Sequence, residues 1–299
     1  MYVITGATGH TGTIAAKTLL SRGHSVRVLG RSAERLRPLT SQGAEQFLCD
    51  LTDAARLTQA FQGAQGVYVL IPPDVTNKDY RGFQERVSDA LASAVAGAKV
   101  NFVVSLSSFG ADKPDKTGPV VGLHNLEQKL NRIDGVNVLH LRPGYFMENT
   151  LPQAQLIRQF GTGMGPLRPE LKLPVIATRD IGAVAAEVLI RLDFKGKQTR
   201  ELLGQRDLTM PEAIAVIGKA IGKPDLSYAQ ATAEQFVAAL VQFGFSQSFA
   251  NLMIEMVEAL NSGHMRALEP RTPRNTTPTS YETFVAEEFV PAFQQANAA

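Results

Sequence analysis

The chain has 299 residues, of which 44% are hydrophobic and 19% are charged. This length and composition are typical of one large or two smaller globular domains with a substantial buried core. The formal net charge is only +2, which argues against a strongly basic nucleic-acid-binding surface. No apolar run reaches the length of a membrane span, and no signal peptide precedes the first predicted strand at residue 2. The single cysteine cannot form an internal disulfide, so we expect a cytoplasmic protein that binds neither nucleic acid nor membrane.

The first predicted strand leads directly into a glycine-rich turn. Residues 2–4 are apolar, glycines follow at positions 6, 9 and 12, and an apolar helical pattern begins at Ile14. A tight turn needs residues without Cβ, and a pyrophosphate needs close approach to the backbone. The following helix offers unpaired N–H groups and the positive end of its dipole. Strand, glycine turn and helix in this order predict a dinucleotide-binding site.

Strands and helices alternate through the first half of the chain. Further strands are predicted over residues 25–29, 46–49, 67–71, 100–106 and 136–141. Helices are predicted over 32–37, between residues 52 and 63, through an apolar i, i+4 pattern of Phe83, Val87, Leu91 and Val95, and over about 121–131. Pro38 is expected to end the second helix, and Thr52 to cap the third. Short apolar strands between helices predict an α/β Rossmann fold, a doubly wound parallel sheet with helices on both faces. Ligands bind beyond the carboxyl ends of such strands.

This alternation fades after residue 150. We therefore predict an NAD(P)-binding Rossmann domain over residues 1–150, and over 151–299 a smaller, mostly helical cap that binds substrate at the ligand-binding edge of the sheet. Its expected elements are a strand at 175–177, a helix from Asp180 to about 192, a helix capped by Thr209, helices at 233–243 and 247–261, and a last helix containing Phe284, Phe289 and Phe293. Glycines 161, 163 and 165 follow no strand, so we expect a mobile loop there and no nucleotide site.

Two residues at strand ends are candidates for the adenosine half of a dinucleotide. Arg31 follows the second strand, where an acidic residue would favour NAD and an arginine can pair with the 2′-phosphate of NADP. The absence of an acid favours NADP(H) over NAD(H), although a solvated surface arginine is the alternative. Asp50 ends the third strand and is either an acceptor for the adenine amino group or a turn residue.

The catalytic candidates lie near the ends of later strands. Ser107 follows the fifth strand and could bond a substrate carbonyl oxygen, or serve only in a turn. His124 begins the fifth helix and is a proton donor or a surface histidine. Tyr145 follows the sixth strand and either lines the pocket or is an ordinary half-buried tyrosine. The five histidines show no metal-ligand spacing, so no metal is expected. Cys49 reads as a small buried residue rather than a reactive thiol.

Several motifs resemble the NmrA-like family of atypical short-chain dehydrogenases. They are ITGATGHTG at 4–12, VRVLGRS at 26–32, LRPGYFMEN at 141–149, RDIGAVAAEVL at 179–189 and LTMPEAIAVIGKAIGK at 208–223. The resemblance implies that the pyrophosphate lies on Gly6, Thr8, Gly9, His10, Thr11 and Gly12. It places the 2′-phosphate on Arg31, the adenine near Asp50 and Leu51, and the remainder of the coenzyme along Ile71, Pro72, Ser107, Pro143, Tyr145 and Phe146.

One departure from that wider family bears on the chemistry. Short-chain dehydrogenases usually use a Tyr-x-x-x-Lys pair for proton transfer, and no tyrosine of this chain has a lysine four residues later. The resemblance implies a histidine near the position of that lysine, which His124 matches. It also implies NADPH-dependent hydride transfer to a small organic acceptor such as a quinone. The alternative is a non-catalytic NADP-sensing regulator that acts on a protein partner.

Overall fold

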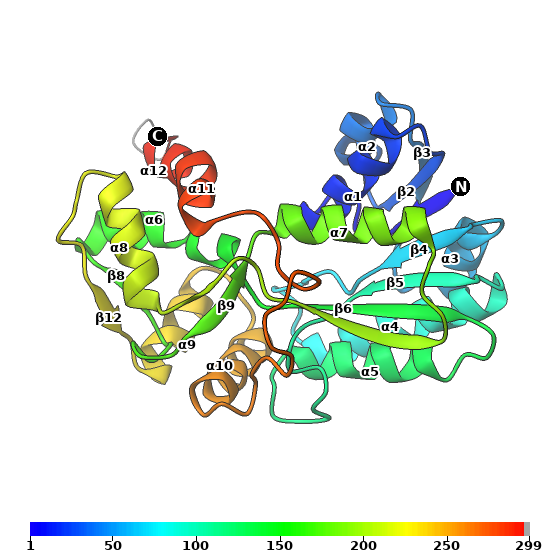
Figure 1. Cartoon of the computed structure of the whole chain (residues 1–299). Coiled ribbons are helices and arrows are strands. Elements are labelled where there is room, and N and C mark those ends of the chain that lie inside the picture. The colour runs from blue at the N-terminus through cyan, green and yellow to red at the C-terminus, as the bar shows by residue number, and fades with distance from the viewer. Residues whose placement is uncertain (296–299) are drawn as a thin grey trace.

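Residues 1–295 are described by the computed structural model, and their centre is a seven-stranded parallel sheet (Figure 1). Across the sheet the strands are β10 (Lys197–Leu202), β6 (Asn137–Pro143), β5 (Phe102–Leu106), β4 (Gly66–Val69), β1 (Tyr2–Ile4), β2 (Val26–Gly30) and β3 (Glu45–Leu48). The chain runs outward from β1 to β3 and then resumes on the other side of β1 with β4. This reversal creates the crevice in which doubly wound sheets bind ligands. The predicted Rossmann fold is confirmed.

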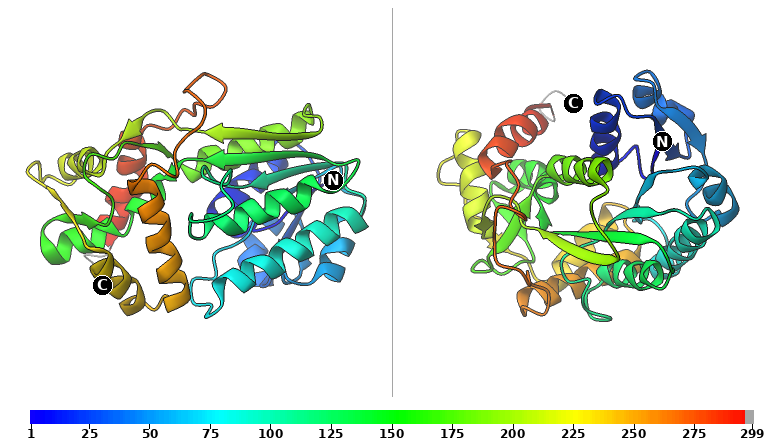
Figure 2. Two further views of the ribbon diagram at one scale, coloured as in Figure 1. Left: turned by 90° about the horizontal axis from the view of Figure 1, so that it is seen from below. Right: turned by 45° about the vertical axis from the view of Figure 1, so that its right-hand side comes forward.

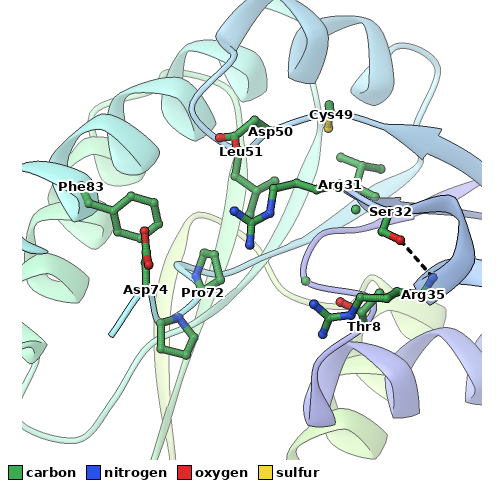
Figure 3. A pocket seen from close by; sticks show the side chains of 14 residues that line it. Thr8, Arg31, Ser32, Arg35, Cys49, Asp50, Leu51, Pro72, Asp74 and Phe83 are labelled. Carbon is green, nitrogen blue, oxygen red and sulfur yellow. Dashed lines mark hydrogen bonds between the residues drawn. The ribbon is translucent and has the colours of Figure 1, made fainter. Parts of the chain in front are cut away.

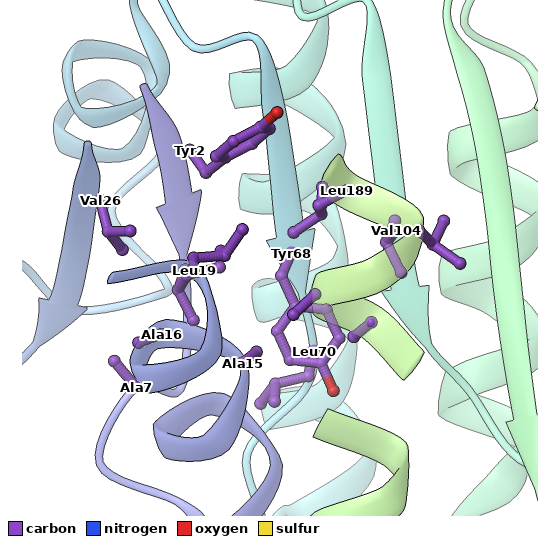
Figure 4. Packing of buried hydrophobic residues seen from close by; sticks show 14 of the residues in the cluster. Tyr2, Ala7, Ala15, Ala16, Leu19, Val26, Tyr68, Leu70, Val104 and Leu189 are labelled. Carbon is purple, nitrogen blue, oxygen red and sulfur yellow. The ribbon is translucent and has the colours of Figure 1, made fainter. Parts of the chain in front are cut away.

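Helices cover both faces of this sheet, which explains why its strands are largely apolar. One face carries α1 (His10–Ser21), α2 (Ala33–Thr40) and α7 (Thr178–Arg191), and the other carries α3 (Ala54–Phe61), α4 (Tyr80–Gly97) and α5 (Val120–Asn131). On the first face, Leu19 of α1, Leu189 of α7 and Tyr68 of β4 are fully buried (Figure 4). Gly182 lets α7 approach α1 closely, because a Cβ there would lie 2.5 Å from the Thr11 carbonyl oxygen.

Two predicted helix boundaries are wrong. Helix α2 continues through Pro38, because Leu36 and Leu39 on either side of the proline are both buried and the proline itself is exposed. Helix α3 is capped by Asp53, whose carboxylate accepts from the backbone N–H of Arg56 at 3.0 Å. The predicted cap, Thr52, instead donates its hydroxyl proton to Asp50.

Beyond the carboxyl ends of the strands lies a mostly helical cap (Figure 2). Strands β7 (Tyr145–Phe146), β9 (Leu173–Ile176) and β11 (Asp207–Leu208) form one small sheet, and β8 (Gly163–Gly165) pairs with β12 (Tyr228–Gln230). The helices are a 3₁₀ turn (Met147–Thr150), α6 (Gln153–Phe160), α8 (Met210–Ala220), α9 (Ala233–Gln242), α10 (Gln247–Asn261), α11 (Tyr281–Phe284), a π-helical turn (Val285–Phe289) and α12 (Val290–Gln295). The capping box that begins α8 at Thr209 and the helical positions of α9 and α10 are confirmed.

The chain crosses between the two parts more often than the predicted division at residue 150 implies. After β6 it enters the cap, returns to the large sheet for α7 and β10, and then enters the cap again. The physical reason is that α7 buries its apolar side against α1, while β10 extends the sheet alongside β6. Residues 151–295 therefore supply both the cap and two elements of the Rossmann fold, α7 and β10.

Two further predictions in the second half are corrected. The glycines at 163 and 165 lie in β8, paired with Tyr228 and Gln230, and only Gly161 has the left-handed backbone of a helix end. The predicted mobile loop is therefore wrong. Asp180 does not cap α7, because its carboxylate accepts from the backbone N–H and the hydroxyl of Thr279 and so fastens the later chain to this helix.

Within residues 1–295, no helix combines the length and the apolarity that a membrane span requires.

Candidate coenzyme site and active site

The glycine turn between β1 and α1 is built from three glycines with different roles. Gly6 has φ +58°, a left-handed conformation that favours glycine. At Gly12 a Cβ would lie 2.3 Å from the Gly6 carbonyl oxygen, so only glycine fits without movement of the backbone. A Cβ on Gly9 would lie 3.3 Å from the same oxygen, which is tight but not prohibitive. Gly12 is therefore the strictest position of the predicted motif.

The first turn of α1 offers unpaired backbone donors. Its N-cap is Gly9, which has no side chain to accept from them, and no acidic residue occupies the first turn. The first intrahelical bond runs from the Thr13 N–H to the Gly9 carbonyl at 2.9 Å, so the N–H groups of residues 10–12 have no partner within the helix. The Thr11 side-chain hydroxyl does not cap these N–H groups, because it accepts a hydrogen bond from the Tyr68 hydroxyl at 3.0 Å, on the side of α1 that faces the sheet. This end of α1 is suited to bind an anion.

Beside the glycine turn lies a pocket at the carboxyl ends of β1, β2, β3 and β4 (Figure 3). It is lined by Gly6, Thr8, Leu29, Gly30, Arg31, Ser32, Arg35, Cys49, Asp50, Leu51, Pro72, Pro73, Asp74 and Phe83. The structure thus brings together six of the predicted coenzyme residues: Gly6, Thr8, Arg31, Asp50, Leu51 and Pro72. From the edge of this pocket the chain continues into α1 through Gly9, His10, Thr11 and Gly12. Ile71 does not line the pocket and packs against the hydrophobic core on the α3 and α4 face of the sheet.

Charge in this pocket is divided between two arginines and two acids. The guanidinium groups of Arg31 and Arg35 both extend into it, and among the described residues neither forms an ion pair within 4 Å (Figure 3). Burial would raise the pKa of Asp50, but hydrogen bonds from Thr52 and the charge of Arg31 outweigh burial and lower it. Asp50 therefore stays ionised, and its Oδ1 already accepts from the Thr52 N–H at 2.9 Å.

Phe83, Asp74 and Cys49 are among the pocket residues that the sequence did not indicate as coenzyme ligands. Phe83 belongs to the apolar pattern of the predicted fourth helix; it packs against the core, and its ring also reaches the pocket next to Asp74 (Figure 3). Asp74 follows the fourth strand closely, so the rule that ligands bind at strand ends could have found it. Cys49 is 8% exposed, as predicted for a small buried residue, and burial raises the pKa of its thiol to about 11.

The predicted catalytic Ser107 is held in a buried ion-pair network. Its hydroxyl donates to Glu127 Oε1 at 2.5 Å, and Arg142 donates to both oxygens of the same carboxylate at 2.9 and 2.5 Å. Ser107 is 3% exposed and Glu127 is 1% exposed. The Ser107 proton is therefore committed to Glu127 and not available to a substrate carbonyl, which differs from the prediction. The sequence indicated neither Glu127 nor Arg142 as its partner.

His124 and Tyr145 lie on elements that meet beyond the ends of β5 and β6. The Nδ1 atom of His124 is 2.9 Å from the Ala111 carbonyl oxygen, an acceptor, so Nδ1 carries the proton and Nε2 has the free lone pair of the neutral ring. Burial raises the pKa of Tyr145 to about 12, so its hydroxyl stays protonated at neutral pH. Tyr145 packs against the same apolar cluster as Leu123 and Tyr228.

The remaining predicted residues are distributed around this region. Pro143 is buried at the end of β6, and Phe146 is half-buried in β7 against the core beneath α1 and α7. Within residues 1–295, no group of three or more His, Cys, Asp or Glu side chains could hold a metal ion.

The comparisons with known proteins agree with this geometry. Residues 2–290 match the NmrA-like family. The chain belongs to the NmrA-like family. It is 29% identical over 280 residues to an NAD(P)H azoreductase of Xenophilus azovorans, covering 92% of this chain and 93% of that protein. It is 27% identical over 260 residues to quinone oxidoreductase 2 of Escherichia coli (strain K12), covering 85% and 86% of the two chains.

A solved structure supports the same family fold. The crystal structure of an NADPH-dependent quinone oxidoreductase from Escherichia coli, complexed with NADPH, superposes with a TM-score of 0.81 over 98% of this chain and all of that one, at 24% identity. These matches confirm the predicted family and fold, and the predicted class of oxidoreductase enzyme is confirmed by the two curated relatives.

Proposed function

We propose that this protein binds NADPH and transfers hydride from it to a small organic acceptor such as a quinone. One observation supports the proposal above all others. A glycine-capped helix terminus and two arginines that form no ion pair within residues 1–295 border the same pocket (Figure 3). The helix terminus suits a diphosphate, and the arginines suit a 2′-phosphate. No acidic residue ends β2, where an NAD-binding protein would hold the ribose hydroxyl.

The residues present fit this coenzyme. The backbone N–H groups of residues 10–12 would hold the diphosphate, and Arg31 with Arg35 would hold the 2′-phosphate. Asp50, Leu51 and Phe83 border the adenine end of the pocket. When bound, NADPH supplies the hydride, and the protein has to orient it and keep water from the acceptor.

The surroundings of Tyr145 favour an apolar, planar acceptor. Half-buried Leu123, Tyr228 and Phe236 belong to the same apolar cluster as Tyr145. Aromatic side chains stack well on flat conjugated rings. The names of the two curated relatives, an azoreductase and a quinone oxidoreductase, are consistent with such acceptors.

The same geometry bears on which group hydrogen-bonds the acceptor and where the acceptor obtains its proton. We assign hydrogen bonding to the acceptor oxygen to the Tyr145 hydroxyl, which keeps its proton, and not to Ser107. His124 Nε2 accepts a hydrogen bond in the neutral ring and donates one only when protonated. A strongly electrophilic acceptor takes hydride without a strong acid beside it, so solvent can supply the proton afterwards. The absence of a Tyr-x-x-x-Lys pair is then no obstacle.

The test is steady-state oxidation of NADPH by the purified protein with a panel of quinones and azo compounds. We expect turnover above the rate without protein, and roughly tenfold slower turnover in Tyr145→Phe, because one hydrogen bond to the acceptor is lost. The control is Arg132→Ala, an exposed arginine at the far end of α5 that should leave the rate unchanged. Tight NADPH binding without turnover on any acceptor would contradict the proposal and favour an NADP-sensing regulator with a protein partner.

A further inference from the structure

A second hollow, separate from the coenzyme pocket, is lined by three arginines. They are Arg191 at the end of α7, Arg200 in β10, and Arg274 in the segment between α10 and α11. The other lining residues are Asp193, Phe194, Gln198 and Pro273. In the left view of Figure 2 the orange segment between α10 and α11 forms a loop beside the yellow-green strand β10. Two parts of the chain that are distant in sequence, residues 191–200 and 273–274, therefore contribute arginines to one hollow.

These arginines are poorly supplied with protein partners. Within residues 1–295, the only ion pair among them joins Arg191 Nε to Asp193 Oδ2 at 3.7 Å, and both of those side chains are more than half exposed. The Nε atom of Arg200 is buried and has no hydrogen-bond partner among residues 1–295. A buried, unpaired charged donor is costly unless something accepts from it.

Neighbouring Arg271 shows that these arginines are not needed to fasten the segment. Arg271 Nη1 donates to the carbonyl oxygens of Leu203 and Gly204, each at 2.8 Å, and Nη2 pairs with Asp207. This arginine satisfies the backbone that it contacts. Arg274, three residues later, lines the hollow together with Arg191 and Arg200, and among the described residues it forms no ion pair within 4 Å.

The charges around the hollow are unbalanced. Burial, followed by the charges of Arg274 and Arg191, lowers the pKa of Arg200, and the nearby carboxylates of Asp193 and Glu269 offset this only in part. Three like charges at one point repel one another in the free protein. An anion placed among them would remove that repulsion and accept the free N–H donors.

We propose that Arg191, Arg200 and Arg274 form a binding site for a phosphate group, either inorganic phosphate or a small phosphomonoester. A tetrahedral phosphate offers oxygens in several directions, and each guanidinium fork can pair with two of them. A bound phosphate would join α7, β10 and the segment between α10 and α11. Since α7 also packs on α1, occupancy would stabilise the face of the sheet that carries the coenzyme helix.

The experiment measures phosphate binding to the full chain saturated with NADP, so that the coenzyme site is already filled. Calorimetric and thermal-shift titrations would use inorganic phosphate and glycerol phosphate, each against chloride at the same ionic strength. We expect saturable binding and stabilisation by at least one of the two. Arg200→Gln and Arg274→Gln should each weaken binding about tenfold or more, since each removes a charge-assisted contact. Arg132→Gln, the exposed control, should bind phosphate as the unchanged protein does.

Stability without phosphate separates a binding role from a structural one. If Arg200 serves this site, Arg200→Gln should unfold at the same or a higher temperature in chloride, because it relieves repulsion. Response to both phosphates indicates a monoester ligand, and response to inorganic phosphate alone indicates the free anion. The proposal would be overturned if neither phosphate compound bound, or if Arg200→Gln and Arg274→Gln bound phosphate as tightly as the unchanged protein. None of these outcomes depends on whether the protein oxidises NADPH.

Discussion

Removing the Arg31 side chain is the sharpest test of coenzyme preference. Arg31 and Arg35 both reach the pocket and have no ion-pair partner in the part of the chain that the structure describes, so they would share a 2′-phosphate that NADPH carries and NADH lacks. A hydrogen bond to a charged group contributes about 1.5–3 kcal/mol. Arg31 is exposed, which places its contribution near the lower end of that range, and Arg35 would retain part of the contact. We expect Arg31→Ala to weaken NADPH binding by about 2 kcal/mol, roughly 30-fold.

NADH provides the internal comparison, because it lacks the phosphate. The dissociation constants of both coenzymes would be measured by calorimetry for the unchanged protein, Arg31→Ala and the Arg31→Ala/Arg35→Ala double variant. NADH affinity should change less than about threefold in each, while the double variant should lose roughly a further tenfold for NADPH. Arg132→Ala should alter neither coenzyme. Equal losses for NADPH and NADH would refute the assignment of Arg31 to the 2′-phosphate.

Three further predictions concern the turn and the buried polar groups. Gly12→Ala should weaken both coenzymes by about tenfold or more in the same titrations, since its Cβ would lie 2.3 Å from the Gly6 carbonyl oxygen; unchanged affinity would contradict this. Glu127→Gln should destabilise the fold by about 3 kcal/mol in urea unfolding, because it leaves the Arg142 charge without its partner; a loss below about 1 kcal/mol would show that the pair contributes little. Burial lowers the pKa of His140 to about 4, so between that pH and the ordinary histidine pKa of about 6.5 the unfolded chain binds a proton that the folded chain does not. Stability should therefore be full above about pH 6.5 and fall by about 3 kcal/mol as the pH drops to about 4, and His140→Asn should flatten that slope.

The sequence determined the features that depend on neighbouring residues. The strand, glycine turn and helix at residues 2–20 were readable because backbone conformation and helix ends are set locally. Arg31 was readable because it directly follows a strand whose end must lie at the ligand-binding edge. The capping box at Thr209 and Glu212 was predicted for the same local reason.

Only the tertiary structure decided which distant groups meet. The commitment of Ser107 to Glu127 depends on β5, α5 and β6 packing together, and no local pattern records that contact. The sequence did not predict that α7 and β10 return to the large sheet, because the local sequence of a helix or strand does not specify which element it packs against. Convergence of Arg191, Arg200 and Arg274 is of the same kind, since charges 83 positions apart in the sequence become neighbours only through packing.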